Sequence, residues 1–469
     1  MSNYISDIFM LVYNLFMTIR SKFALFAGST SYIFLHKILH RGGTSLPGKI
    51  AYQLDPAILK EFADKIQTVI ITGTNGKTLT TALCARVLSK SGRLIITNKS
   101  GSNMIQGIVA TIMAHAAQIR QANRQGQKPI AVLEVDEANV KAAAESLQAS
   151  HFVLTNIFRD QMDRYGEIYT TYEKITDGIN SSPKAEVIAN GDSPIFARKP
   201  YANPVTYFGF ADRPETGDHR APTNTDGILA PTDDQVLHYH YLTYANLGSY
   251  FTPDKSFKRP DLKYAVTKVD SLTPAKSDFE IDQHAFTLPL GGLYNIYNAL
   301  AAYALGREFG LTADQIFAAL NEDSRIFGRQ EQLQIGDHLV TIVLIKNPVG
   351  ANSVIDMMIS DPQPFSLVTL LNANYADGID TSWIFDAEFE RLHETKLAKI
   401  IVGGQRYKDF SVRLKMAGFP DQIVEQDFSK LIDRIKALPT KNVYVAATYT
   451  SMLMFRAELT KAGLAKGSF

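Results

Sequence analysis

Cysteine is almost absent from this chain, and its absence excludes several classes of protein. The 469 residues contain one cysteine, Cys84, so the chain can form neither an internal disulfide framework nor a cysteine-based zinc site. The chain also has no excess of one charge sign, because it contains 48 Lys and Arg residues and 47 Asp and Glu residues. That balance argues against binding to bulk nucleic acid. The low cysteine content is typical of a reducing compartment, so we expect a cytoplasmic protein.

Long apolar runs are missing as well, including at the N-terminus. The runs 8–19 and 23–35 are shorter than the roughly 18–20 apolar residues that a membrane-spanning helix needs. No basic segment precedes the first run, so we expect no secretory signal. Its apolar residues recur at helical spacing, which predicts an N-terminal helical extension over residues 1–45. Two interpretations stay open: a helix packed on the protein's own body, or one lying on the inner membrane surface.

Runs of β-type residues alternate with helical stretches, which predicts the α/β class. Strands are expected at 68–71, 94–97, 130–135, 152–156 and 185–189, with helices at 79–89, 104–118 and 140–147 between them. A second such unit begins near residue 328, with strands at 340–345, 366–371, 399–402, 422–424 and 442–446 and helices at 387–394 and 430–437. We therefore expect a central domain over 46–325 and a smaller Rossmann-like C-terminal domain over 326–469. The stretch 211–263, rich in Pro, Asp, Thr and Tyr, reads as an insertion with a β-hairpin at 236–241 and 247–251.

A glycine-rich loop connects the first predicted strand to the helix that follows it. Its sequence is Gly73-Thr74-Asn75-Gly76-Lys77-Thr78. The backbone N–H groups of such a loop, with a helix N-terminus behind them, form a concave phosphate site. Lys77 is expected to reach the β- and γ-phosphates of ATP, and Thr78 to ligate Mg²⁺. Ile71 replaces the first glycine of the general phosphate-loop pattern, but the strand–loop–helix context favours the ATP interpretation over a chance turn.

Acidic and amide residues follow two further predicted strands. Glu134 ends the strand 130–135, where ligands bind in open α/β sheets, so it is a candidate second Mg²⁺ ligand. A solvated acidic turn is the alternative, and a stronger one for Asp136 and Glu137. Asn156 and Asp160 follow the strand 152–156 and are candidates for ordering the metal, the nucleotide or the substrate. For these two residues a structural ion-pair network stays open.

These motifs resemble those of the Mur ligase family, which form amide bonds at the expense of ATP. The resemblance rests on the phosphate loop, Glu134, Thr155-Asn156, Asn190-Gly191-Asp192-Ser193-Pro194 and the segment 294–302 that starts Tyr-Asn-Ile-Tyr-Asn. It implies that ATP phosphorylates a carboxylate and that an amine attacks the acyl phosphate. It also implies that Asn295 and Asn298 lie near the nucleotide. Arg329 and Lys346 would neutralise phosphate when the C-terminal domain closes.

The C-terminal third resembles one branch of that family in particular, the MurT ligase subunits of lipid II isoglutaminyl synthase. The segments that carry this are 328–331, 346–350 and 371–386, the last with an Asp-Gly-x-Asp-x-Ser-Trp element. The branch implies amidation of the α-carboxyl of D-glutamate in the lipid II stem peptide, through an acyl phosphate. Ammonia would come from a GatD-like glutamine amidotransferase, whose Cys–His pair Asp380 would complete as a catalytic residue. Cys84 lies on a predicted helix and is expected in the core, so it is not a glutaminase nucleophile.

The chain departs from the MurT branch in the insertion. MurT proteins often carry a four-cysteine zinc ribbon there, but the two knuckles correspond to 230–234 and 252–256, which contain no cysteine. We therefore expect no zinc, and a hairpin held instead by an apolar core of Val236, Leu237, Tyr239, Tyr241, Leu247, Tyr250 and Phe251. His238 and His240 point to one face of a strand, but the sequence offers no third ligand. Gln161 stands where many Mur ligases have a histidine near the metal.

Two other functions stay open at this point. One is a free-standing ligase that adds an amino acid, similar to muramyl or folylpolyglutamate ligases, and the segment 371–386 argues against it. The other is a non-catalytic scaffold that binds ATP and activates a glutaminase, and the intact Lys77, Thr78 and Glu134 argue against it. Replacing Lys77 with alanine separates the scaffold from the enzyme, because a scaffold would still support amidation.

Overall fold

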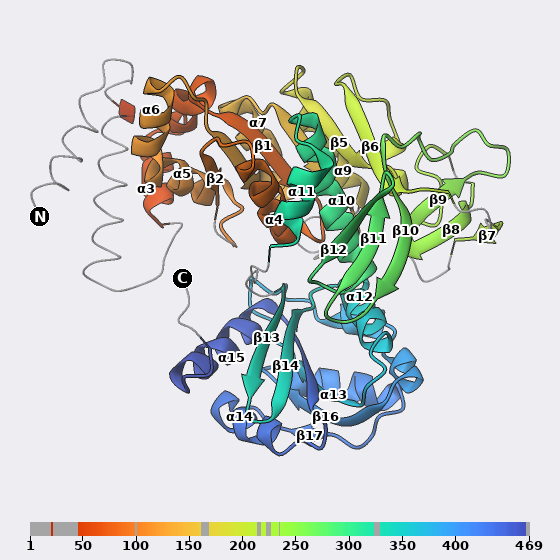
Figure 1. Cartoon of the computed structure of the whole chain (residues 1–469). Helices are drawn as coiled ribbons and strands as arrows, with labels where there is room; N and C mark the ends of the chain where they lie inside the picture. Colours follow the sequence, from red (N-terminus) through yellow and green to blue (C-terminus); the bar gives the residue numbers. More distant parts are fainter. Residues whose placement is uncertain are drawn as a thin grey trace, which may run out of the picture.

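The computed structural model describes residues 20–21, 46–98, 101–160, 168–212, 217–221, 227–233, 235–322 and 329–465. These residues form a larger central body and a smaller C-terminal body, one beside the other (Figure 1). The predicted extension over 1–45 lies almost wholly outside the described residues, as does Gln161. In the described part, no helix is long and apolar enough to cross a membrane.

A nine-stranded sheet forms the middle of the central body, in the order β12-β11-β10-β6-β5-β4-β1-β3-β2. The strands from β2 to β10 in this order run parallel, and β11 and β12 add an antiparallel edge. β1 lies between β3 and β4, so the loops after these three strands meet at one edge. The strands are β1 (Gln67–Thr72), β2 (Ile95–Thr97), β3 (Ile130–Glu134), β4 (His151–Leu154), β5 (Glu186–Asn190), β6 (Val205–Phe210), β10 (Tyr264–Leu272), β11 (Ser277–Ile281) and β12 (His284–Leu288).

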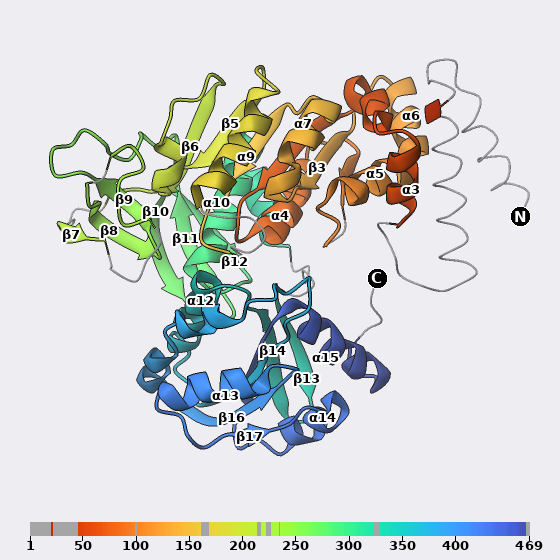
Figure 2. The ribbon, with the colours of Figure 1, turned by 180° about the vertical axis from the view of Figure 1, so that it is seen from behind.

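Helices cover both faces of this sheet, as Figures 1 and 2 show from opposite sides. Ile70 packs into a core with α5, α7 and α9, whereas Val69 and Ile71 pack into a second core with α4, α10 and α11. This alternation is the period of two that a strand buried on both faces requires. The helices are α3 (Leu46–Leu54), η2 (Ile58–Lys65), α4 (Lys77–Ser89), α5 (Ile105–Ala114), α6 (Ala116–Arg124), η3 (Glu137–Asn139), α7 (Val140–Leu147), α9 (Ile168–Asn180), η4 (Pro194–Ala197), α10 (Leu293–Glu308) and α11 (Ala313–Leu320).

The single helix expected over 104–118 is wrong in its extent. The chain forms α5 and α6 with a break at His115, whose backbone angles, φ −101° and ψ 5°, are not helical. The His115 ring Nδ1 lies 2.9 Å from the Thr111 carbonyl oxygen, so the side chain contacts the end of the first helix. A mostly apolar run carries no signal for such a break. Cys84, in contrast, is buried on α4 as expected.

The insertion forms a small three-stranded sheet, β7 (His219–Arg220), β8 (His238–Tyr244) and β9 (Leu247–Phe251). The predicted hairpin is therefore present, but its expected core is partly wrong. Val236 is 39% exposed, and Leu247 packs into the core of the central body. The core of the insertion consists of Ala221, Ala230, Leu237, Tyr239, Tyr250 and Phe257. His240 stacks on Phe251, and His238 Nδ1 lies 2.6 Å from Asp218 Oδ1.

Hydrogen bonds close the two turns that align with the zinc knuckles. Thr252 Oγ1, on a fully buried residue, accepts the Phe257 N–H at 3.0 Å, and Asp254 Oδ1 accepts the Ser256 N–H at 3.0 Å. Gln235 Nε2 from the first turn donates to Asp254 Oδ2 in the second at 2.9 Å. The pKa of Asp254 is held well below its usual range by the Ser256 N–H and by the Gln235 amide. The two turns are thus joined by side chains of the chain itself.

The C-terminal body is a six-stranded sheet in the order β13-β14-β18-β15-β16-β17, parallel except for β13. Its mostly parallel order with helices confirms the Rossmann-like α/β class. The helix expected over 387–394 is a 3₁₀ helix of six residues, η6. The elements are β13 (Arg329–Ile335), β14 (His338–Leu344), α12 (Pro348–Ile359), β15 (Phe365–Leu370), η5 (Ser382–Phe385), η6 (Phe389–Glu394), β16 (Leu397–Gly403), α13 (Tyr407–Met416), β17 (Ile423–Val424), α14 (Phe428–Lys436), β18 (Asn442–Ala447) and α15 (Tyr449–Lys461).

Candidate active site

The glycine-rich loop joins β1 to α4, as the sequence predicts. At two of its positions no residue other than glycine fits. Gly73 and Gly76 have φ angles of +129° and +85°, which L-residues rarely adopt. A Cβ on Gly73 would lie 2.4 Å from Thr155 Oγ1, and one on Gly76 would lie 2.3 Å from Asn298 Oδ1. The loop is therefore closely packed between the end of β4 and α10, which leaves no room for a side chain at either position.

The segment after β4 holds the loop in place. Asn156 accepts the Thr74 N–H through its carbonyl oxygen at 2.8 Å and the Asn75 N–H through Oδ1 at 2.9 Å. Thr155 Oγ1 donates to the Asn75 carbonyl oxygen at 2.9 Å, and the Phe158 N–H donates to Thr74 Oγ1 at 3.1 Å. Asn156 thus shapes the phosphate loop through direct bonds to its backbone.

Lys77 lies at the floor of the site, in the first turn of α4. It is 8% exposed, and its Nζ donates to Glu137 Oε1 at 2.8 Å and to the carbonyl oxygen of Gly73. Burial opposes the lysine charge, but the carboxylates of Glu137, Asp136 and Glu134 outweigh it and raise the pKa of Lys77. Lys77 therefore carries its charge throughout the neutral pH range.

Glu137 is not part of a solvated turn, which was its stronger alternative from sequence. It lies in η3 and is 5% exposed. Burial raises its pKa, and the nearby charges of Lys77 and Lys346 act against that rise. Asp136 is also buried, and its side chain caps η3 by accepting the Ala138 N–H at 3.2 Å. The acidic residues after β3 are thus buried side chains of the site.

Glu134 ends β3 and is 4% exposed, and it lines the same cavity as Thr78. Asn103 Nδ2 donates to Glu134 Oε1 at 3.2 Å, while the Asn98 side chain bonds both the N–H and the C=O of Glu134. A carboxylate and a hydroxyl are the hard oxygen ligands that Mg²⁺ prefers, with phosphate and water filling the remaining positions. No cluster of three or more His, Cys, Asp or Glu suited to a metal occurs among the described residues. The donor set therefore fits Mg²⁺ bound together with a nucleotide.

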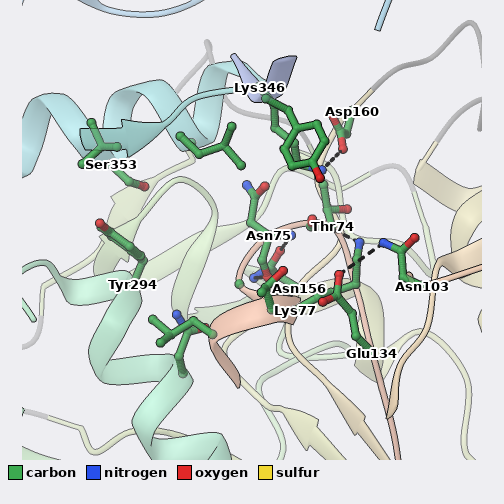
Figure 3. Close-up of a pocket in the computed structure, with 18 of the residues that line it drawn as sticks. Thr74, Asn75, Lys77, Asn103, Glu134, Asn156, Asp160, Tyr294, Lys346 and Ser353 are labelled. Carbon is green, nitrogen blue, oxygen red and sulfur yellow. Dashed lines mark hydrogen bonds and ion pairs between the residues drawn. The ribbon is translucent and has the colours of Figure 1, made fainter. Parts of the chain in front are cut away.

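A cavity of about 370 Å³ brings most of the predicted residues together at the boundary between the two bodies (Figure 3). The predicted residues that line it are Thr74, Asn75, Gly76, Lys77, Thr78, Glu134, Asn156, Asp160, Asn295, Asn298 and Lys346. Asp380 is not among the lining residues. Arg329 begins β13, but its side chain lies outside the described part of the chain.

The cavity is also lined by residues that were not predicted as site residues. Among these are Asn103, Tyr294, Gln330, Ser353, Tyr375 and Tyr449. Gln330 Nε2 donates to Tyr294 Oη at 2.8 Å and so links the start of β13 to α10. Tyr294, Gln330 and Tyr375 lie in segments that carry the family resemblance, but nothing in the sequence marked their side chains as cavity walls, and the other three lie outside any motif. Asn298 Oδ1 accepts the Thr80 hydroxyl at 3.0 Å, so this predicted residue also ties α10 to α4.

Side chains from the C-terminal body reach across the cavity to the phosphate loop. Asn75 Nδ2 donates to Asn347 Oδ1 at 3.2 Å, and Asn347 Nδ2 returns a bond to Asn75 Oδ1 at 3.0 Å. Lys346, the residue before Asn347, forms an ion pair with Asp160 from the loop after β4. These contacts bring Lys346 beside the loop after β4, and its role toward phosphate stays a prediction.

Asp380 lies outside the cavity on an exposed loop. Its Oδ1 accepts the N–H of Ser382, the first residue of η5, at 2.8 Å, and this bond lowers the pKa of Asp380, so the carboxyl is ionised at neutral pH. Asp377 anchors the same loop by accepting the Thr450 N–H at 2.7 Å. Tyr375, five residues before Asp380, lines the cavity. The loop therefore runs from the cavity wall to the surface.

The architecture places the chain in a known class of enzymes. It superposes on a pseudomurein peptide ligase type C from Methanothermus fervidus with a TM-score of 0.62 at 19% identity, covering 86% of this chain and 80% of that one. A MurF ligase from Thermotoga maritima in complex with ADP matches with a TM-score of 0.59 at 15% identity, covering 88% and 85%. Residues 71–306 match the Mur ligase middle domain family. The fold and the phosphate loop are those of a Mur ligase.

The sequence comparisons identify the family more closely. Residues 344–452 match the MurT ligase C-terminal family. The chain is 45% identical, over 94% of its length and 97% of the relative's, to the lipid II isoglutaminyl synthase (glutamine-hydrolyzing) subunit MurT of Streptococcus pneumoniae. It is 32% identical, over 90% and 93%, to the protein of the same name in Staphylococcus aureus. This chain belongs to the MurT family.

Proposed function

We propose that this chain is the ligase subunit that uses ATP to amidate the α-carboxyl of D-glutamate in the lipid II stem peptide, giving D-isoglutamine. The names of the MurT relatives supply the class of reaction, a glutamine-dependent carbon–nitrogen ligation on lipid II. The observation that carries the proposal for this chain is the cavity, which is lined by Lys77 of the phosphate loop and by Glu134 at the end of β3, and where Asn347 bonds Asn75 of that loop.

The residues around the loop suit transfer of the ATP γ-phosphate to a carboxylate. Lys77 carries a charge on the floor of the cavity and neutralises phosphate there, while the loop N–H groups bind the phosphate oxygens. Lys346 reaches the same region from the C-terminal body. Thr78 and Glu134 are the residues that would hold Mg²⁺, which neutralises phosphate charge when bound. The acyl phosphate formed in this way is a carboxyl carbon activated for attack by an amine.

Ammonia for the second step would come from a GatD-like glutaminase partner that meets Asp380. A Cys–His pair needs a third group that orients and stabilises the imidazolium. Asp380 suits this task because it is exposed and ionised, and because the Ser382 N–H fixes one of its oxygens. Tyr375, Ile379 and Phe385, all within five residues of Asp380 in the sequence, are large side chains that are 72%, 62% and 45% exposed. An apolar surface of this kind is suited to a protein partner.

The test uses this chain co-expressed with a GatD-like glutaminase and supplied with lipid II, MgATP and either glutamine or ammonium. Mass spectrometry of the product reports conversion of a carboxylate to an amide. Parallel samples carry Asp380→Asn or Lys77→Ala. We expect Asp380→Asn to lose turnover with glutamine and keep turnover with ammonium, because only the glutaminase triad is affected. Lys77→Ala is expected to lose both.

Each other outcome has a definite meaning. Amidation by the Lys77→Ala complex at the wild-type rate would favour the scaffold. No amidation by the wild type with either nitrogen source would refute the isoglutaminyl synthase proposal and favour a ligase that adds an amino acid. Unchanged glutamine-driven turnover in Asp380→Asn would leave the ligase in place and remove Asp380 from the triad.

A further inference from the structure

One carboxylate oxygen in the cavity has no partner. Asp160 lies on the loop after β4, and its side chain is 9% exposed. Its Oδ2 is paired with Lys346, but its Oδ1 is buried and receives no hydrogen bond from the described residues. Among the buried side-chain atoms without a partner in the described part, it is the only carboxylate oxygen. Figure 3 shows Asp160 with Lys346 above the phosphate loop.

A buried carboxylate oxygen without a donor is costly, so we expect a ligand, an ion or a water to supply the donor at this site. The reactants of the proposed reaction differ in what they can supply. ATP and the substrate carboxylate present anionic oxygens, which accept hydrogen bonds and are repelled by Asp160. A divalent cation is disfavoured, because the Lys346 charge already occupies the other oxygen of the same carboxylate. Ammonia is small, presents three N–H donors and keeps its lone pair for the reaction.

We infer that Asp160 binds the ammonia nucleophile in the amide-forming step, with Lys346 acting as a positioning residue for its carboxylate. This inference rests on the proposed function. Asp160 Oδ1 accepts one N–H bond, which orients the nitrogen lone pair toward the acyl carbon above the phosphate loop. Lys346 fixes the plane of the carboxylate from the C-terminal body, so the ammonia site is complete only when the two bodies are together.

The step balances without a further reactant. The nitrogen lone pair forms the C–N bond, and the nitrogen becomes positively charged in the tetrahedral intermediate. The Asp160 carboxylate stabilises this developing charge more than it stabilises neutral ammonia, which is what accelerates a reaction. The bond between the acyl carbon and the phosphate oxygen then breaks, and its electron pair leaves on the phosphate. Two protons remain on the amide nitrogen and the third passes to phosphate, giving the primary amide and hydrogen phosphate.

The test separates the two half-reactions in the full chain co-purified with its glutaminase. ATP labelled with ¹⁸O at the β–γ bridge, with lipid II and without a nitrogen source, reports reversible acyl phosphate formation as movement of the label to non-bridge positions. Amidation is measured separately with ammonium. For Asp160→Asn we expect label movement within about threefold of the wild type, and kcat/KM for ammonium lower by about tenfold or more, as for loss of one charged contact.

Asp386→Asn is the matched control. It breaks an exposed ion pair between the two bodies, Arg159–Asp386 at 2.9 Å, and leaves the cavity carboxylate intact. We expect it to retain both readouts. Equal loss of label movement and amidation in Asp160→Asn would overturn the inference and assign Asp160 to the nucleotide or metal, and full retention of both would also overturn it. A wild type that shows neither readout would instead refute the proposed function.

Discussion

Lys77 Nζ lies 2.8 Å from Glu137 Oε1, and both side chains are more than nine-tenths buried. The phosphate-loop lysine is therefore paired with a carboxylate of η3, on the strand-end segment that also carries Glu134. A buried ion pair of this kind leaves an uncompensated charge when one partner is removed. Glu137 thus supplies the negative charge beside Lys77 that a bound phosphate can also supply.

The first prediction concerns that counter-charge. Glu137→Gln is expected to lower the free energy of unfolding by about 1–3 kcal/mol without nucleotide, because Lys77 stays buried beside a neutral group. MgATP should raise the melting temperature of the variant more than that of the wild type, since phosphate replaces the lost charge. Thermal unfolding with and without MgATP measures both effects. Glu322→Gln, which removes a surface pair with Lys90, is the control and should change neither. An equal nucleotide effect in variant and wild type would contradict the prediction.

A second prediction concerns pH. Burial lowers the pKa of His151 from 6.5 to about 4, so the folded protein holds this ring neutral. Below pH 6.5 the unfolded chain binds more protons than the folded one, so this histidine removes stability as the pH falls from 6.5 to about 4. The difference between the two pKa values corresponds to about 3 kcal/mol.

His151→Phe keeps an aromatic ring beside Phe309, whose centroid lies 4.7 Å from that of His151, and removes the titration. We expect its melting temperature to fall less steeply than that of the wild type across this pH range. His284→Gln, at an exposed position, serves as the control. Parallel pH profiles for His151→Phe and the wild type would show that His151 does not titrate in this way.

The third prediction concerns the buried pair Arg259–Asp192. Asp192 is fully buried; its Oδ1 lies 2.8 Å from Arg259 Nη1, and its Oδ2 accepts the Tyr297 hydroxyl at 2.6 Å. Arg259→Met should cost about 3–5 kcal/mol, because it leaves a carboxylate buried without a counter-charge. Adding Asp192→Asn should recover part of the loss. Asp212→Asn, which removes the exposed partner of Arg259, should cost less than about 1 kcal/mol. Urea unfolding of the wild type, Arg259→Met, Asp192→Asn, their double variant and Asp212→Asn measures these effects, and additive effects in the double variant would refute the coupling.

The fourth prediction concerns the insertion. Because Thr252, Asp254 and Gln235 close and join its turns, a strong zinc chelator should leave the melting temperature unchanged. Thr252→Val keeps the shape of this buried side chain but removes the acceptor of the Phe257 N–H, and should lower the free energy of unfolding by about 1–2 kcal/mol. Calorimetry with and without chelator is the measurement. A lower melting temperature after chelation would show that the fold depends on a metal.

Local patterns predicted the phosphate loop well. The glycines, Lys77 and Glu134 lie where a strand–loop–helix unit and a strand end must place them, because consecutive residues set that geometry. For Glu137 a solvated turn stayed open from sequence, because its buried partner Lys77 is 60 residues away along the chain. The reciprocal bond between Asn75 and Asn347 joins residues 272 positions apart, so only the assembled molecule contains it.

The resemblance to the Mur ligase family predicted more of the site than residue chemistry alone did. Asn156 and Asp160 were both candidates for ordering the metal, the nucleotide or the substrate. In the structure Asn156 bonds the backbone of the phosphate loop, whereas Asp160 Oδ1 receives no hydrogen bond from the described residues. Composition could not distinguish these cases, because an amide and a carboxylate in one polar loop look alike until their partners are known. The break between α5 and α6 escaped prediction for a similar reason, since apolar spacing continues through it.

One loop begins in the cavity wall at Tyr375 and ends at exposed Asp380. Between these two residues, Asp377 holds the loop by accepting the Thr450 N–H. A ligand that fixes one end of so short a segment restricts the conformations of the other. Thermodynamic linkage makes such coupling reciprocal. If nucleotide in the cavity raises the affinity for a partner at Asp380, the partner raises the affinity for nucleotide by the same factor. In the proposed reaction, nitrogen release and carboxylate activation can thereby be coupled through the six residues from Tyr375 to Asp380.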